Sequence, residues 1–279
     1  MKHALLVLIM CVLLTGTAHA QTYSFPWLDE ADTISRTVIR VIPLPSGYER
    51  VAAERGSFGD WLRSIPLKAE GSAVHLYNGH LKFNQSAHFR VLDIDVGSRN
   101  LQQCADAIMR LRAEYLYGQS KYDDVHFNFT SGDSASFRSW IDGFRPVVQG
   151  NDVSWRKAAE PDSLYKCFRR YLDIIFTYCG SYSLSRELRP VETPEHVQIG
   201  DIFIQGGFPG HAVIVVDVAV DSANGRRAMM LAQSYMPAQE IHILKNLRNP
   251  DLSPWFEINA DDRLYTPEWT FNWDDLRRF

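Results

Sequence analysis

The chain has 279 residues, of which 46% are hydrophobic and 22% are charged, and its formal net charge is −4. This composition is typical of a globular protein with one large domain or two small ones. The weakly acidic balance and the lack of basic clusters argue against nucleic acid or an anionic membrane surface as a partner. The sequence has no HExxH motif, no CxxC motif and no tight His/Asp cluster, so we expect neither a metal site nor a cofactor.

The N-terminus "MKHALLVLIMCVLLTGTAHA" has the layout of a secretory signal peptide. A lysine precedes a short apolar run, and a small-x-small pattern ends at Ala20. The bulky Met10 before Cys11 argues against lipoprotein processing. We therefore expect a signal peptide over residues 1–20, cleavage after Ala20, and a periplasmic or secreted protein that starts at Gln21. No later segment is long and apolar enough to span a bilayer.

The first half of the mature chain predicts short strands and helices. Residues 21–56 are expected to form an extended lead-in, because "VIPLPSGYERV" disfavours helix. "GSFGDWLRSIP" predicts a short helix from about Ser57, and "AVHLYNGHLKF" predicts a hairpin with an Asn-Gly turn. Residues 57–160 then hold the strand "FRVLDIDV", a long helix from Leu101 to Tyr117 and the short helix "SASFRSWIDGF".

The second half predicts one more long helix and then a sheet. Residues 162–179 read as an amphipathic helix with Asp162 as its N-cap, inside a helical insertion at 161–195 that ends in a proline-bearing loop. Residues 196–249 contain three β-rich segments, and 250–279 are expected to wrap irregularly over the core. The mature chain is therefore predicted to be a single α+β domain.

Three cysteines remain after signal cleavage, which leaves at least one without an internal partner. Cys167 and Cys179 lie twelve residues apart in one predicted helix, about 18 Å along its axis. A disulfide tolerates a Cα separation of less than about 7 Å. We expect both to be reduced packing residues.

Cys104 is the candidate nucleophile. It falls in the first turn of a predicted helix in which Asn100 is the N-cap and Gln103 the N3 residue. The helix dipole and free backbone N–H groups there favour a thiolate, so we expect a depressed pKa. Cys104 also lies on the apolar stripe of this helix, and a buried packing role is the alternative.

His211 is the candidate base. In "FIQGGFPGHAVIVVDV" it follows a glycine-rich turn and opens the most apolar strand of the chain. With the hairpin turn near 222–225, the end of the next strand returns beside it, so Gln233 or Ser234 is expected to orient its ring. His126, in "DVHFNF", is the rival base.

"IGDIFIQGGFPGHAVIVVDV" resembles the NlpC-type and CHAP branches of the papain-like cysteine peptidases and amidases. A "GD-hydrophobic-F" strand in those families leads into a "GH-small-hydrophobic" strand that carries the base, and the nucleophilic cysteine starts an earlier helix. The matching elements here are Gly200–Phe203 and Gly210–Ala212. Cys104 corresponds to the nucleophile and Gln233 to the third polar residue, although the usual "DCSG" is "QCAD" here. Over its full length the chain also resembles a family of uncharacterised exported bacterial proteins.

The resemblance implies a papain-like cysteine hydrolase that cleaves an amide, with cell-wall peptide as the implied substrate. Cys104 attacks, His211 acts as base and then acid, Gln233 orients His211, and the side chain of Gln103 or Gln102 supports the oxyanion with the Cys104 N–H. The alternatives are a non-catalytic exported binding or scaffold protein and a Cys–His acyltransferase or transglutaminase-like enzyme. Aromatic residues expected to line a groove are Trp61, Trp140 and Tyr235.

Overall fold

The computed structural model describes residues 23–28, 34–260 and 262–279. The predicted signal peptide at 1–20 lies outside these residues. The described chain is an α+β fold whose sheets are antiparallel, and its main sheet has nine strands in the order β2-β11-β10-β9-β8-β15-β7, with β1 paired to β9 and β12 to β10. The strands of this sheet are β1 (Tyr48–Arg50), β2 (His88–Val91), β7 (Arg189–Pro190), β8 (Ile202–Gln205), β9 (His211–Asp221), β10 (Arg227–Gln233), β11 (His242–Leu244), β12 (Trp255–Glu257) and β15 (Leu276–Arg278).

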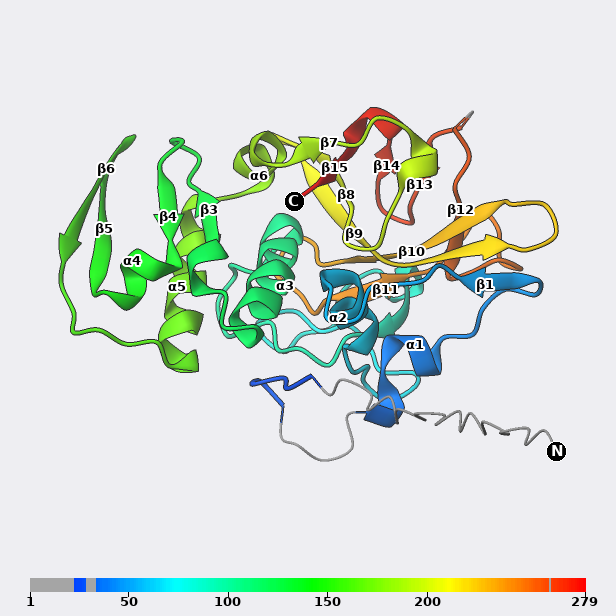
Figure 1. Ribbon diagram of the computed structural model, residues 1–279, viewed down its shortest axis with the longest axis horizontal. Coiled ribbons are helices and arrows are strands. Elements are labelled where there is room, and N and C mark those ends of the chain that lie inside the picture. The colour runs from blue at the N-terminus through cyan, green and yellow to red at the C-terminus, as the bar shows by residue number, and fades with distance from the viewer. Residues whose placement is uncertain (1–22, 29–33, 261) are drawn as a thin grey trace, which may run out of the picture.

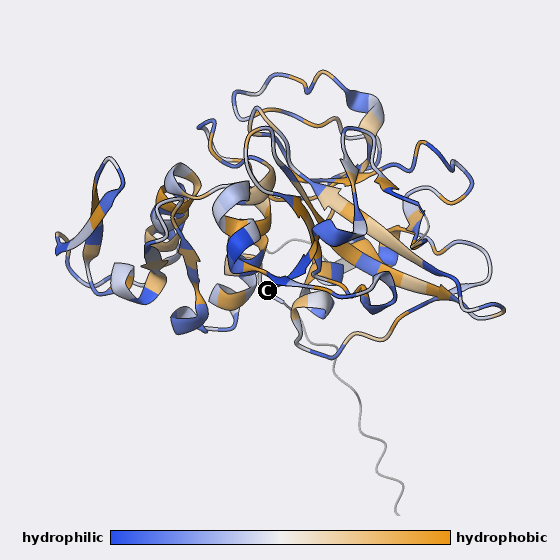
Figure 2. Cartoon of the chain, turned by 90° about the horizontal axis from the view of Figure 1, so that it is seen from above, coloured by the Kyte–Doolittle hydropathy of each residue, from blue (hydrophilic) through white to orange (hydrophobic). Residues whose placement is uncertain are grey.

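The hairpin β9–β10 is the centre of this sheet (Figure 1). Its strands are buried almost throughout, because β-branched and other apolar residues in "HAVIVVDVAV" and "RAMMLAQ" fill both faces of a covered strand. In Figure 2 these central strands carry most of the hydrophobic colour of the sheet. The register pairs Ala232 with Ile214, so the end of β10 returns beside the start of β9.

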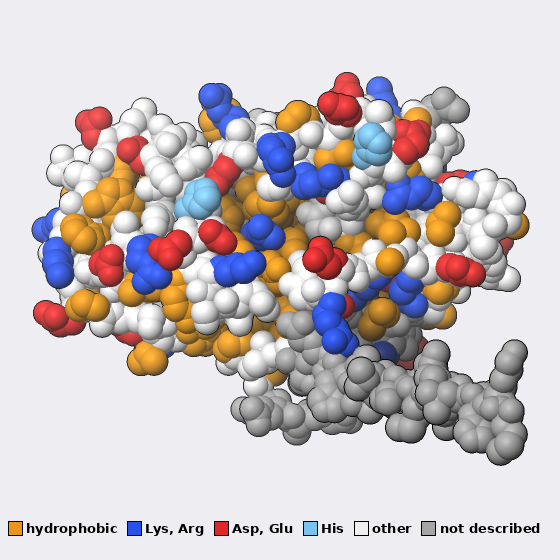
Figure 3. Space-filling model, in the orientation of Figure 1, with side chains coloured by type: hydrophobic (Ala, Val, Ile, Leu, Met, Phe, Trp, Pro, Cys, Tyr) orange, Lys and Arg blue, Asp and Glu red, His pale blue; other side chains and the backbone are white. Residues whose placement is uncertain are grey.

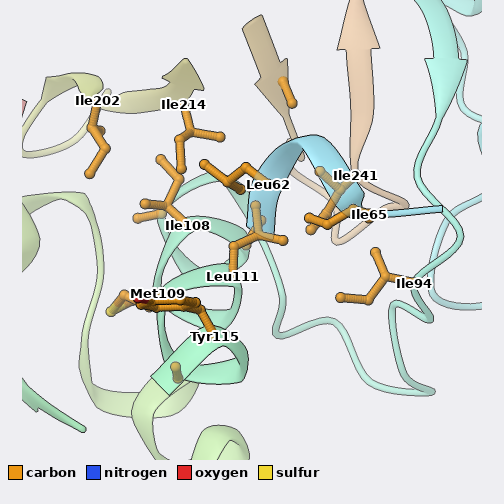
Figure 4. Packing of buried hydrophobic residues seen from close by; sticks show 14 of the residues in the cluster. Leu62, Ile65, Ile94, Ile108, Met109, Leu111, Tyr115, Ile202, Ile214 and Ile241 are labelled. Atoms are coloured by element: carbon orange, nitrogen blue, oxygen red, sulfur yellow. The ribbon is translucent and has the colours of Figure 1, made fainter. Parts of the chain in front are cut away.

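Helix α3 (Cys104–Gly118) covers one face of the sheet and packs on β9. Figure 4 shows Ile108 and Leu111 of this helix facing Leu62 of α2 (Phe58–Ser64) and Ile214 of β9. These residues belong to one core cluster, and the opposite face of the sheet buries a second, smaller cluster that includes Phe203 and Phe271. The first residue of α3 is thereby fixed against the start of β9.

A helical layer lies beyond α3, on the side away from the main sheet (Figure 1). It contains α4 (Phe137–Ile141) and α5 (Tyr165–Tyr178) with two small hairpins, whereas α6 (Ser181–Glu187) packs against β8 of the main sheet. The hairpins pair β3 (His126–Asn128) with β4 (Ser134–Ser136), and β5 (Phe144–Gln149) with β6 (Asp152–Lys157). Helix α5 ends at the edge of the candidate site and α6 begins there, as described below.

Several predicted elements are confirmed. Ser57 caps α2, since its side chain accepts a hydrogen bond from the Asp60 N–H at 3.2 Å. The Asn-Gly hairpin closes with a 2.9 Å bond from Gly79 N–H to the Leu76 carbonyl, and its Gly79 takes the positive φ of 82° that this turn requires. The three late β-rich segments form neighbouring strands β8, β9 and β10.

Other predictions are wrong in detail. The loop expected after 179 contains helix α6, and the described part of the 21–56 lead-in contains the short helix α1 (Val38–Val41) and strand β1. The tail from 250 is more than a wrap, because its last strand β15 pairs with both β8 and β7. Within the described residues, no helix combines the length and the apolar character needed to cross a membrane.

Candidate active site

Cys104 is the first residue of α3, which begins three residues later than predicted. Gln103, not Asn100, is the N-cap, and its backbone N–H donates to the Asp106 carboxylate at 3.0 Å. Asn100 instead accepts the Ala238 N–H at 2.8 Å. The short loop before the helix is therefore tied to the segment after β10.

Cys104 and His211 line the same cavity, which has a volume of about 440 Å³ and is named the Cys104 cavity below. The backbone N–H of Ala212, the residue after His211, acts to lower the pKa of the Cys104 thiol. The walls of the cavity come from the start of α3, the end of α5, the start of α6, the 207–210 turn and the segment after β10.

His211 is buried, and its Nε2–H donates to Gln233 Oε1 at 2.9 Å. The antiparallel register of the hairpin brings these two side chains together. Because Nε2 is committed, Nδ1 is the ring nitrogen that is left to accept a proton. The ring is held among aromatic groups, with centroid distances of 4.6 Å to Tyr235 and 5.3 Å to Trp269.

Gln233 belongs to a buried polar network that the sequence did not suggest. Its Nε2–H donates to Glu268 Oε2 at 2.7 Å, which fixes the amide so that Oε1 faces His211. The same carboxylate forms an ion pair with Lys82, whose side chain is buried. Lys82 and the Gln233 amide also approach His242 Nε2, each at 3.4 Å. Glu268 comes from the irregular C-terminal segment, where an isolated charged residue carries no sequence signal.

The expected low pKa of Cys104 is not found. Burial raises the pKa of the thiol to about 11, with a further increase from Asp106, and backbone N–H groups oppose this only in part. Burial likewise lowers the pKa of His211 to about 4, although its bond to Gln233 favours the charged form. Desolvation therefore outweighs the helix dipole, and at pH 7 the Cys104 thiol and the His211 imidazole that line this cavity are both neutral.

Burial raises the pKa of Asp106 to about 8, so this carboxyl is largely protonated at neutral pH. Its Oδ1 is buried without a hydrogen-bond partner among the described residues. Cys179 is the C-cap of α5 and lines the Cys104 cavity, which corrects the mid-helix packing role expected for it. Cys167 is buried as expected, and the three cysteines within the described residues are reduced.

The remaining candidates lie elsewhere. His126 is an exposed residue of β3 that does not line the cavity. Ser234 is committed to backbone carbonyls at 3.1 and 2.8 Å. Gln103 lines the cavity, whereas the Gln102 side chain turns away and accepts Arg110 Nη1 at 2.6 Å. Of the three aromatic residues expected in a groove, Tyr235 lines the cavity, but Trp61 and Trp140 are packed in the core.

Residues 38–278 match the family described as Domain of unknown function (4846). The chain belongs to this family. No curated protein and no solved structure matches it. The family match spans both α3 and the β9–β10 hairpin, so every residue that lines the Cys104 cavity falls inside it. In the described residues, no group of three or more His, Cys, Asp or Glu side chains is arranged to hold a metal ion.

Proposed function

We propose that this member of the family is an exported papain-like cysteine hydrolase that cleaves an amide through Cys104 and His211. The observation that carries the proposal is the 2.9 Å bond between His211 and Gln233 at the wall of a cavity that Cys104 also lines. That bond commits Nε2 and leaves Nδ1 as the proton acceptor, while the thiol is at the N-terminus of a helix.

The chemistry follows from the neutral resting pair. The Cys104 thiol transfers its proton to His211 Nδ1 as the sulfur adds to the substrate carbonyl carbon. The imidazolium then returns this proton to the leaving amine, the C–N bond breaks, and an acyl-enzyme remains. Water, deprotonated by His211, hydrolyses the thioester and releases the acid. The Cys104 N–H and the Gln103 side chain at the cavity wall support the oxyanion.

Cys179 provides an internal control for testing this function. It lines the same cavity as Cys104 but is the C-cap of α5, and the helix dipole there disfavours a thiolate. Iodoacetamide labelling mapped by mass spectrometry should modify Cys104 faster than Cys179, and buried Cys167 only after unfolding. His211→Ala should slow the modification of Cys104 alone.

The same preparation is then assayed on peptide anilides and aryl esters. Hydrolysis that is lost in Cys104→Ser establishes the enzyme. If Cys104 and Cys179 react equally fast with iodoacetamide and no substrate is hydrolysed, solvent access alone determines the labelling rates. The catalytic proposal is then rejected in favour of a binding role. Accumulation of a transfer product with an added amine, at the expense of the free acid, would instead identify the acyltransferase alternative.

A further inference from the structure

A second cavity, of about 210 Å³, lies next to the Cys104 cavity and is named the basic cavity here. The two cavities share the lining residues Leu101 and Phe176, so they adjoin at these side chains. The basic cavity is bounded by the loop before α3 on one side and by α5 on the other. Nothing in the proposed reaction requires it.

The basic cavity is lined by four cationic side chains. Lys166, Arg169 and Arg170 are spaced three and four residues apart on α5, so they share one face of that helix. Arg99 faces them from the 96–102 loop, and the one acidic residue in the lining is Asp173. The Cys104 cavity differs, because no lysine or arginine lines it and its acidic residue is the buried Asp106.

Arg99 and Arg170, at the opening of the basic cavity, form only exposed ion pairs with other described residues of the chain. Arg170 lies 3.3 Å from Asp162 and Arg99 lies 3.6 Å from Asp173, with all four side chains substantially exposed. Exposed pairs of this kind contribute little stability and are easily exchanged for another anion. Lys166 has no ion-pair partner in the part of the chain that the structure describes.

Two buried donors at the basic cavity, Gln102 Nε2 and Arg169 Nη1, make no hydrogen bond among the described residues, and Arg169 Nη1 lies 3.9 Å from Glu114 Oε1. Arg169 lies near the fully buried Arg110, and burial together with this like charge lowers its pKa. Asp95 and Glu114, which pair with both arginines, offset part of this repulsion. A buried donor without a hydrogen bond is destabilising, and an anionic ligand is the kind of group that accepts from both donors.

We propose that the basic cavity is a substrate subsite for a carboxylate. The preferred substrate is then a peptide in which an acidic residue neighbours the residue whose carbonyl Cys104 attacks. The uncharged part of the substrate occupies the Cys104 cavity, and the carboxylate passes Leu101 and Phe176 to reach Lys166 and Arg170. This inference rests on the proposed function and adds the chemical class of the substrate.

The test uses pairs of peptide anilides that differ only by glutamate or glutamine beside the cleaved residue. The parent should cleave the glutamate peptide about tenfold more efficiently, which corresponds to about 1.4 kcal/mol, and added salt should reduce this preference. The double variant Lys166→Met/Arg170→Met should lose most of the preference. Lys157→Met, an exposed change on β6 away from both cavities, should keep it. Equal cleavage of both peptides by the parent overturns the inference while leaving the hydrolase intact.

Calorimetric binding separates the two proposals. The same peptides, as amides, are titrated into Cys104→Ala protein with the basic cavity intact and into the same protein carrying Lys166→Met/Arg170→Met. Tighter binding of the glutamate peptide to the first protein alone supports the carboxylate subsite even if no peptide is ever cleaved. Equal affinity for both peptides in the first protein refutes it.

Discussion

Strand β9 carries two buried polar side chains, Asp217 and His211, whose hydrogen bonding differs. Asp217, near the far end, is completely buried and its carboxylate is saturated. It accepts Arg50 Nε at 2.7 Å, Arg63 Nε at 2.7 Å and the Val218 N–H at 2.8 Å. His211, at the near end, has one ring nitrogen committed to Gln233 and faces a cavity.

The difference is the one expected between a structural polar group and the general base that is proposed for His211. A buried charge is tolerated when hydrogen bonds and opposite charges satisfy it, and Asp217 meets that condition. A general base must keep one position free, and burial then leaves it neutral at pH 7. Within one strand, therefore, the number of satisfied hydrogen-bonding positions distinguishes Asp217 from His211, the base of the proposed hydrolase.

The largest effect expected from this comparison is on turnover. Cys104→Ala should abolish hydrolysis, and His211→Ala should reduce kcat/KM by roughly 10³-fold, because the thiol loses its proton acceptor. Both variants should keep a Tm close to that of the parent. The measurement is steady-state hydrolysis together with thermal unfolding followed by circular dichroism. A His211→Ala protein that unfolds but shows undiminished turnover per folded molecule would place His211 with Asp217 as a structural residue.

Asp217→Asn should have the complementary effect. Removing the carboxylate leaves Arg63 buried without compensation, at a cost of about 3–5 kcal/mol in the free energy of unfolding. The matched control is Asp123→Asn, which breaks a pair of similar geometry with Arg138 on the surface, at 2.6 and 3.2 Å. The control should unfold like the parent in urea. Equal destabilisation by the two changes would mean that burial of the ion cluster does not matter.

Much of the β9–β10 hairpin is predictable because residues close together in the sequence determine its strands and turns. A glycine-rich turn, a β-branched run and a second turn define two antiparallel strands, and their register places position 233 beside 211 without knowledge of the rest. The start of α3 is harder to predict, since Asn100 is a preferred N-cap residue but the structure uses Gln103. The Asp106 side chain completes the cap in the structure, and Cys104 is therefore the first residue of the helix instead of the fourth.

The rest of the site depends on contacts across long stretches of sequence. Glu268 reaches Gln233 from the tail and Lys82 from an early hairpin, and neither segment has a pattern that indicates this. The pKa values are also tertiary properties. The helix dipole at Cys104 is visible in the sequence, but the burial that outweighs it is produced by the packing of β9, α5 and α6 around the thiol.

Glu268→Gln tests whether the charged groups near His211 affect its proposed role as a base. The amide can still accept from Gln233, but Lys82 becomes a buried cation without its counter-charge. Lys82 already lowers the pKa of His211, and His242, which faces the same network, is neutral because its pKa is lowered mainly by burial. The unbalanced charge should disfavour the imidazolium formed during attack and reduce kcat roughly tenfold. KM should change little.

The double variant Lys82→Met/Glu268→Gln is the control for this prediction. It removes the cation together with its partner, so turnover should recover relative to Glu268→Gln alone. The pH dependence of kcat provides a second measurement, since a lower His211 pKa moves the acid limb of the profile to lower pH. A loss of kcat that is identical in single and double variants, with no shift of the acid limb, would show that Glu268 serves packing only.

Asp106 is neither a fully hydrogen-bonded carboxylate like Asp217 nor a proposed base like His211. Its substitution is expected to have the smallest effect, which is on stability. It is buried like Asp217, but its Oδ1 has no partner among the described residues, and burial raises its pKa to about 8. A carboxyl with a folded pKa above its unfolded value of about 3.9 binds more protons in the folded state, so folding stability falls as pH rises from about 4 to 8. Asp106→Asn removes this pH-dependent loss of stability.

The Tm of the Asp106→Asn variant relative to the parent should therefore rise between pH 5 and pH 8 and then level off. A difference in Tm that is constant over this range would show that Asp106 is ionised in the folded protein, and that its carboxylate is satisfied in the way that Asp217 is.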